Sequence, residues 1–153
     1  MQTLFGDDER GPMTDLLDVN VWLALVDENH VHRSAALHYW QNEASELIAF
    51  CRVSMLGFLR LSTLRGVLSS PLTPERAWAV YGEYLQEPGV GFLSEPSEVE
   101  KRLAAFSLQP SFRAQLWTDA YLAALALSSG CRLVSFDSDF RAFDGLNFLH
   151  LTL

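Results

Sequence analysis

The sequence predicts an α/β fold in three layers, with helices flanking a mostly parallel central sheet of four to five short strands. One observation on the sequence carries this prediction. Apolar runs of four or five residues, a usual length for a buried strand, alternate along the chain with longer segments of helical pattern. Such alternation is typical of a mostly parallel sheet whose strands are joined by helices.

The composition predicts one domain with a substantial core, because the chain has 153 residues of which 49% are apolar. No apolar run approaches the ~18 residues that would span a bilayer. The N-terminus lacks the apolar core of a secretory signal, and the two cysteines suit a reducing cytoplasm. We expect a cytoplasmic protein without a membrane segment, with its domain in 13–153 and an extension outside the core in 1–12.

The first predicted strand, 15–19, places Asp18 near its carboxyl end. Asn20 follows and is suited to cap a helix over 21–26. After a polar loop, a second helix is expected over 34–46.

A second strand, 47–51, leads into a helix over 55–63 with Ser54 as its predicted cap. Gly57 in the first turn of this helix costs roughly 1 kcal/mol relative to alanine. We therefore expect another part of the chain to pack closely against it. Arg60 lies one turn further along the same face.

The middle of the chain continues the alternation. Thr73 and the following proline predict the start of a helix that runs over 73–85. A third strand is expected over 90–93, and a helix capped by Ser97 runs to about residue 106.

The stretch from 118 to 139 is a helix followed by a strand. Thr118 is the predicted helix cap, Asp119 lies in the first turn, and Gly130 is placed for a left-handed stop. The strand 132–136 then ends at Asp137. A final strand is expected over 147–151.

Carboxylates recur at one kind of place in this pattern. Asp18 and Asp137 follow strands and Asp119 begins a helix, so all three should meet at one edge of the sheet. Asp139 lies close to Asp137. Gathered carboxylates repel one another unless cations bind between them, and oxygen ligands suit Mg²⁺ or Mn²⁺. Such an ion can activate water for attack on a phosphoryl group, although each acid taken singly could be a turn or capping residue.

The net charge of −8, with one lysine among eleven basic residues, argues against a passive nucleic-acid binder. It does not exclude chemistry on a phosphodiester, because the ten arginines could contact phosphates locally.

Three segments resemble the PIN-domain ribonucleases, specifically the VapC-type toxins of toxin–antitoxin pairs: LLDVNVWLAL, MLGFLRLST and TDAYLAALALSSGCRLVSFDSDF. The resemblance extends from about Asp15 onward and implies a PIN-like fold. It implies a metal-dependent endoribonuclease that forms a homodimer and is inhibited by a VapB-type antitoxin. The family's catalytic, metal-binding acids fall on Asp18, Asp119 and Asp137, with Asp139 as a further candidate ligand.

One position departs from that family, because its usual glutamate at the start of the third helix falls here on Gly57. A branch with a GFLRL motif shares this loss, which leaves one ligand fewer and the number of metal ions open. Asn20 and Arg60 are expected to contact the RNA substrate or the antitoxin.

Other functions with clustered aspartates fit less well. Receiver domains and haloacid-dehalogenase-type phosphatases need a lysine near the acids, and the one lysine, Lys101, lies in a predicted helix far from them. A PIN scaffold retained for protein binding, with weak or lost catalysis, remains the alternative.

Overall fold

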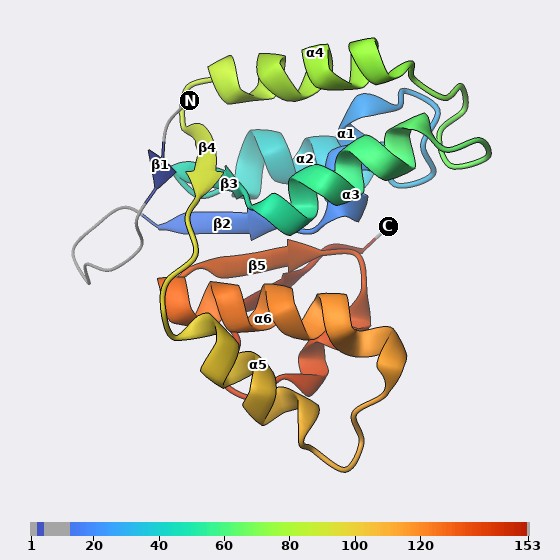
Figure 1. Ribbon diagram of the computed structural model, residues 1–153. Coiled ribbons are helices and arrows are strands. Elements are labelled where there is room, and N and C mark those ends of the chain that lie inside the picture. The colour runs from blue at the N-terminus through green and yellow to red at the C-terminus, as the bar shows by residue number, and fades with distance from the viewer. Residues whose placement is uncertain (1–2, 5–12, 153) are drawn as a thin grey trace.

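The computed structural model describes residues 3–4 and 13–152 and has the expected α/β architecture (Figure 1). The strands form one six-stranded sheet in the order β1-β4-β3-β2-β5-β6, and all five pairings are parallel. Their bounds are β1 Thr3–Leu4, β2 Thr14–Leu17, β3 Leu47–Phe50, β4 Val90–Leu93, β5 Arg132–Ser135 and β6 Phe148–His150.

The sixth strand comes from the segment expected to lie outside the core. Thr3 and Leu4 pair with Phe92 and Leu93 at the edge of the sheet. Two residues carry no sequence pattern, so this pairing could not be anticipated. The rest of that extension, 1–2 and 5–12, lies outside the described residues.

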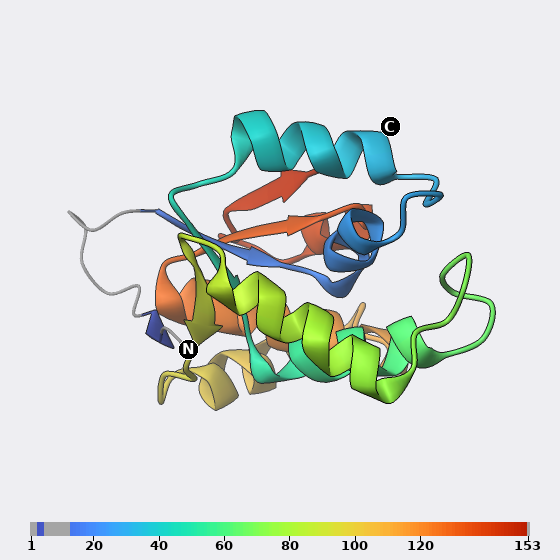
Figure 2. The ribbon, with the colours of Figure 1, turned by 90° about the horizontal axis from the view of Figure 1, so that it is seen from above.

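Helices cover both faces of the sheet. They are α1 Val19–Val26, α2 Arg33–His38, α3 Arg52–Thr63, α4 Pro74–Gln86, α5 Val99–Ser107 and α6 Trp117–Ser129, with a π-helical turn Tyr39–Glu43 and 3₁₀ turns Ala114–Leu116 and Ser138–Ala142. Helices α1 to α4 lie on one side and α5 and α6 on the other (Figure 1). Seen from above, α1 lies between α2 and α4 (Figure 2).

The four central strands, β2 to β5, are largely buried, as in other parallel sheets covered by helices on both faces, whereas the edge strand β6 is half-buried. Leu17 faces the core on the α1 side, where Trp22 stacks on Phe50 at 3.8 Å between ring centroids. Leu16 and Leu133 face the core on the α6 side. This burial explains why the strands are continuous apolar runs in the sequence.

The predicted start of α4 and the predicted end of α6 are confirmed. The Thr73 side chain accepts a hydrogen bond from Arg76 N and caps α4. Gly130 ends α6 with φ 66°, in the left-handed region that favours glycine.

The prediction that Asn20 caps α1 is wrong. The helix begins at Val19, and Asp18 is its cap, with Val19 N donating to Asp18 Oδ1 at 2.8 Å. A carboxylate at the strand end reaches the first free amide directly, so the helix starts two residues earlier than expected.

Three other helix starts also differ. Helix α3 begins at Arg52, with Ser54 inside it, where its hydroxyl accepts from Cys51 N at 2.9 Å in a capping box. Helix α6 begins at Trp117 because a 3₁₀ turn leads into it, so Thr118 is not its cap. Helix α5 begins at Val99 rather than next to Ser97.

Candidate active site

Four aspartates meet at the carboxyl edge of the sheet, and we call them the acidic cluster: Asp18, Asp119, Asp137 and Asp139. Strands β2 and β5 are parallel neighbours, so the residues that follow them emerge at the same edge. One carboxylate oxygen from each of Asp119, Asp137 and Asp139 lies within 4.8 Å of the other two. Two acids expected as principal ligands and the one expected as an auxiliary thus form the tightest group.

Asp18 adjoins this group and is held by its own hydrogen bonds. Its carboxylate accepts from Val19 N at 2.8 Å and from the Ser135 hydroxyl at 2.7 Å. Burial raises the pKa of Asp18, these hydrogen bonds oppose the rise, and the charge of Asp137 adds to it. Asp18 is therefore fixed in place and shares the electrostatic field of the other acids.

Asp119 is the most perturbed acid that remains open to solvent. Burial, followed by the charges of Asp18, Asp137 and Asp139, raises its pKa to about 7. Within the described residues, no acid of the cluster forms an ion pair with an arginine, lysine or histidine. Among the described residues, the cluster is thus a concentration of negative charge that no ion pair neutralises.

The donor set fits a hard divalent cation. The three converging side chains offer only carboxylate oxygens, the ligands preferred by Mg²⁺ and also suited to Mn²⁺. Asp119, Asp137 and Asp139 would hold such an ion. Asp18 lies beside them, outside this group of three, and its expected role as a ligand stays a prediction.

Ser135, which the sequence interpretation overlooked, links the parts of this edge. Its hydroxyl donates to Asp18 Oδ2 at 2.7 Å and accepts from Asp137 N at 2.9 Å and from Asn20 Nδ2 at 3.0 Å. Its side chain is fully buried. The available signal was a polar residue ending an apolar strand two positions before Asp137.

Asn20 therefore stabilises the carboxyl end of β5 through hydrogen bonds. Besides its bond to Ser135, its Oδ1 accepts from Phe136 N at 3.4 Å. The expected contact of Asn20 with RNA or antitoxin stays a prediction.

Gly57 meets the close approach that its position predicted. A Cβ there would lie 2.6 Å from Val19 Cγ2, closer than such atoms approach. Val19 directly follows Asp18, so α3 packs tightly against the start of α1 next to the acidic cluster.

Arg60 is exposed on α3 and, among the described residues, its side chain has no hydrogen-bond or ion-pair partner. Its expected contact with RNA or antitoxin stays a prediction.

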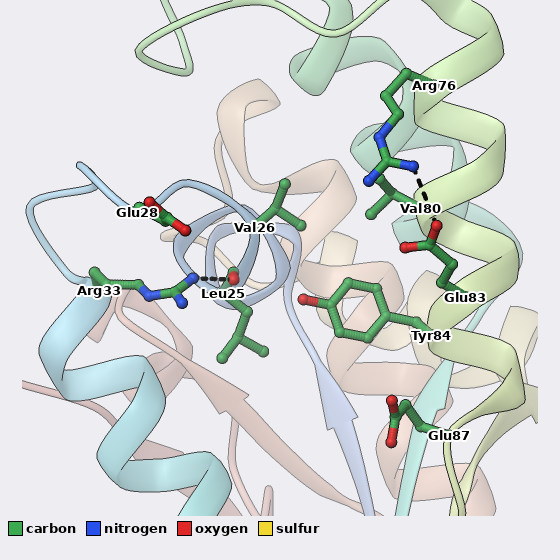
Figure 3. Close-up of a pocket in the computed structure, with 9 residues that line it drawn as sticks. All are labelled: Leu25, Val26, Glu28, Arg33, Arg76, Val80, Glu83, Tyr84 and Glu87. Atoms are coloured by element: carbon green, nitrogen blue, oxygen red, sulfur yellow. Dashed lines mark hydrogen bonds and ion pairs between the residues drawn. The ribbon is translucent and has the colours of Figure 1, made fainter.

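A separate cavity of about 270 Å³ lies between α1 and α4 (Figure 3). Leu25, Val26 and Val80 supply its apolar wall, and an Arg76–Glu83 ion pair of 3.1 Å lies on its rim. No acid of the cluster lines it, so it is distinct from the candidate active site. Among the described helices, none combines the length and apolar character needed to cross a bilayer.

Comparison with known proteins agrees with this architecture. The model of the PIN domain matches residues 16–146. Ribonuclease VapC41 of Mycobacterium tuberculosis is 39% identical over 137 residues, which cover 86% of this chain and 94% of that protein.

Two solved structures share the fold. VapC20 of Mycobacterium tuberculosis, a sarcin–ricin loop cleaving toxin, superposes with a TM-score of 0.67 at 16% identity, covering 87% of this chain and 97% of that one. A toxin–antitoxin complex from Klebsiella pneumoniae gives a TM-score of 0.61 at 12% identity, covering 88% and 95%.

The fold, the acid-lined edge and these matches define a PIN domain. Within that family, to which the chain belongs, its similarity is to the VapC ribonucleases.

Proposed function

We propose that this protein is an endoribonuclease toxin that hydrolyses phosphodiester bonds in RNA with the help of Mg²⁺ or Mn²⁺. The observation that carries the proposal is the convergence of three carboxylates within 4.8 Å in a chain similar to ribonuclease VapC41. The raised pKa of Asp119 supports it, because uncompensated carboxylates favour a divalent cation.

Each residue of the edge has a distinct part in this proposal. Asp119, Asp137 and Asp139 hold the ion, which supplies Lewis acidity at the phosphoryl group when bound. Asp18 adds negative charge from a fixed position, and Ser135 sets that position through its 2.7 Å hydrogen bond. Asn20 holds the end of β5 against the start of α1 through its hydrogen bond with Ser135.

We also propose inhibition by a VapB-type antitoxin. The support is the shared fold with the Klebsiella pneumoniae toxin–antitoxin complex. A cytoplasmic location fits an RNA substrate and the two buried, unpaired cysteines, Cys51 and Cys131.

A homodimer is part of the same proposal. Leu56, Trp78 and Trp117 are each at least half exposed, which suits side chains that a partner subunit covers. Light scattering at micromolar concentration tests this, and a monomer mass would contradict it.

The decisive test replaces Asp119 with asparagine. We expect the wild-type protein to cut RNA with Mg²⁺ or Mn²⁺ and not with EDTA, and Asp119→Asn to lose this cleavage. The variant should melt at the same temperature or slightly higher without metal, because one of four like charges is removed.

Asp144→Asn is the matched control, since Asp144 is an exposed acid in the turn before β6. It should cut RNA at the wild-type rate. Wild-type protein that neither cuts RNA nor binds Mn²⁺ in a calorimetric titration would instead support a PIN scaffold used for protein binding.

A further inference from the structure

Arg141 extends from the 3₁₀ turn Ser138–Ala142, two residues after Asp139. Its side chain is exposed, and its Nη2 lies 3.0 Å from Nδ1 of His150 at the end of β6. Because β6 is parallel to β5, this end of β6 lies at the same sheet edge as the acidic cluster.

His150 connects this guanidinium to the strand end that bears Asp137. Its Nε2 lies 3.1 Å from the Phe136 carbonyl oxygen. A carbonyl only accepts, so Nε2 donates to it, and Nδ1 of the neutral ring accepts from Arg141. The guanidinium is therefore one imidazole ring away from the peptide that joins Phe136 to Asp137.

Among the described residues, the positive charge of Arg141 has no negatively charged partner. Arg141 donates a hydrogen bond to the neutral ring of His150 and forms no ion pair with the acids beside it. The planar guanidinium has further N–H groups directed away from this bond, and such groups suit two-point contact with a phosphate. In a chain of net charge −8, a cation held beside the acids can attract an RNA backbone that the acids themselves repel.

We propose that Arg141 contacts a phosphate of the RNA strand next to the phosphodiester that is cut, and that His150 is the positioning residue that holds Arg141 there. This inference rests on the proposed ribonuclease function and adds a phosphate contact at Arg141 to the RNA or antitoxin contact expected of Arg60. Arg60 has no comparable tether to the acidic cluster.

The test measures binding of a fluorescently labelled single-stranded RNA by anisotropy, at several salt concentrations. All proteins carry Asp119→Asn, so that the RNA is not consumed. Arg141→Ala should weaken binding about five- to tenfold, and the slope of log K against log salt should fall by about 0.7, the value for one phosphate contact on a single strand. Arg102→Ala, the matched control at an exposed arginine of α5, should change neither quantity.

His150 is tested in the same assay. His150→Phe should give part of the Arg141→Ala loss, while His150→Gln, whose amide can both accept and donate, should bind RNA nearly as well as the parent. The melting temperature of each variant separates loss of fold from loss of contact.

Three results would overturn the inference: an unchanged salt slope in Arg141→Ala, an equal change in Arg102→Ala, or no RNA binding by the parent protein. A separate cleavage assay with the wild-type protein, which keeps Asp119, distinguishes failure of this inference from failure of the proposed function. If wild-type protein cuts RNA and Arg141→Ala binds it unchanged, only the Arg141 contact is wrong. If RNA binding depends on Arg141 and wild-type protein never cuts, only the cleavage activity is wrong.

Discussion

Strand β2 carries an aspartate at each end, and the two are treated in opposite ways. Asp15, at the amino end, is fully buried and receives Arg132 Nε and Nη2 at 2.9 Å each. Tyr39 donates to it at 2.5 Å and the Ser45 hydroxyl at 2.7 Å. Asp18, three residues later, joins three other acids that have no ion-pair partner among the described residues.

The difference shows which end of the sheet the fold neutralises by itself and which end it leaves charged. Asp15 and Arg132 are direct neighbours in the register of β2 and β5, so the fold completes their charge pair by itself. At the other end of the same two strands, Ser135 and Asn20 supply hydrogen bonds but no positive charge. A buried acid can thus be neutralised by this fold, whereas the acidic cluster has no ion-pair partner among the described residues.

The largest effect should follow from breaking the amino end. Asp15→Ala leaves the partly buried guanidinium of Arg132 without its carboxylate, which typically costs about 3–5 kcal/mol. We expect a loss of that size in the free energy of unfolding, measured with urea. Removing Arg132 as well, in Asp15→Ala/Arg132→Met, should recover part of the loss.

Asp139→Ala serves as the opposite-end control and should unfold at the wild-type denaturant concentration or above it. A loss for Asp15→Ala no greater than that of the control would contradict the contrast between the two ends.

The next effect concerns pH at the acidic cluster. The pKa of Asp119 is about 7 when folded and lies near 3.8 when unfolded. Between these values the folded protein binds more protons, so stability falls as pH rises and the loss is complete above about 7. In EDTA, the stability advantage of Asp119→Asn over wild type should therefore be larger at pH 8 than at pH 5.

Metal binding gives the second half of that pH test, because the ligands must be ionised. The Mn²⁺ affinity of wild-type protein should rise up to about tenfold per pH unit below 7 and level off above it. Affinity that does not change between pH 5.5 and 8 would show that Asp119 is not a ligand.

The smallest effect tests how tightly the acidic end is packed. Gly57→Ala places a methyl group against Val19, an overpacking cost of typically 1–3 kcal/mol that the helix preference for alanine offsets by about 1. We expect a net loss of about 1 kcal/mol by urea unfolding. In a Val19→Ala background the same change should be neutral or stabilising; equal losses in both backgrounds would show that Val19 is not the obstacle.

Much of this molecule could be predicted from local sequence. The alternation of strands and helices gave the fold, and the edge position of Asp119 and Asp137 followed from helix and strand ends alone. Gly57 predicted a close approach because a glycine inside a helix lowers helix stability relative to alanine.

What escaped prediction depends on register between distant strands. Ser135 meets Asp18 across 117 residues, as Arg132 meets Asp15, and neither pairing is visible until β2 and β5 are aligned. The cap of α1 was misplaced for a smaller reason: Asn20 and Asp18 are both good capping residues, and the sequence alone does not show that the helix begins directly after Asp18.

The pairing of β2 with β5 also determines when the acidic cluster can assemble during synthesis of the chain. Asp18 emerges from the ribosome early, whereas Ser135 and Asp137 follow only after more than a hundred further residues. Contacts so distant in sequence form late, because the chain between them must first be ordered. A nascent chain that ends before β5 therefore has no assembled acidic cluster, and a translating cell carries the first four strands of this protein without the centre proposed to cut RNA.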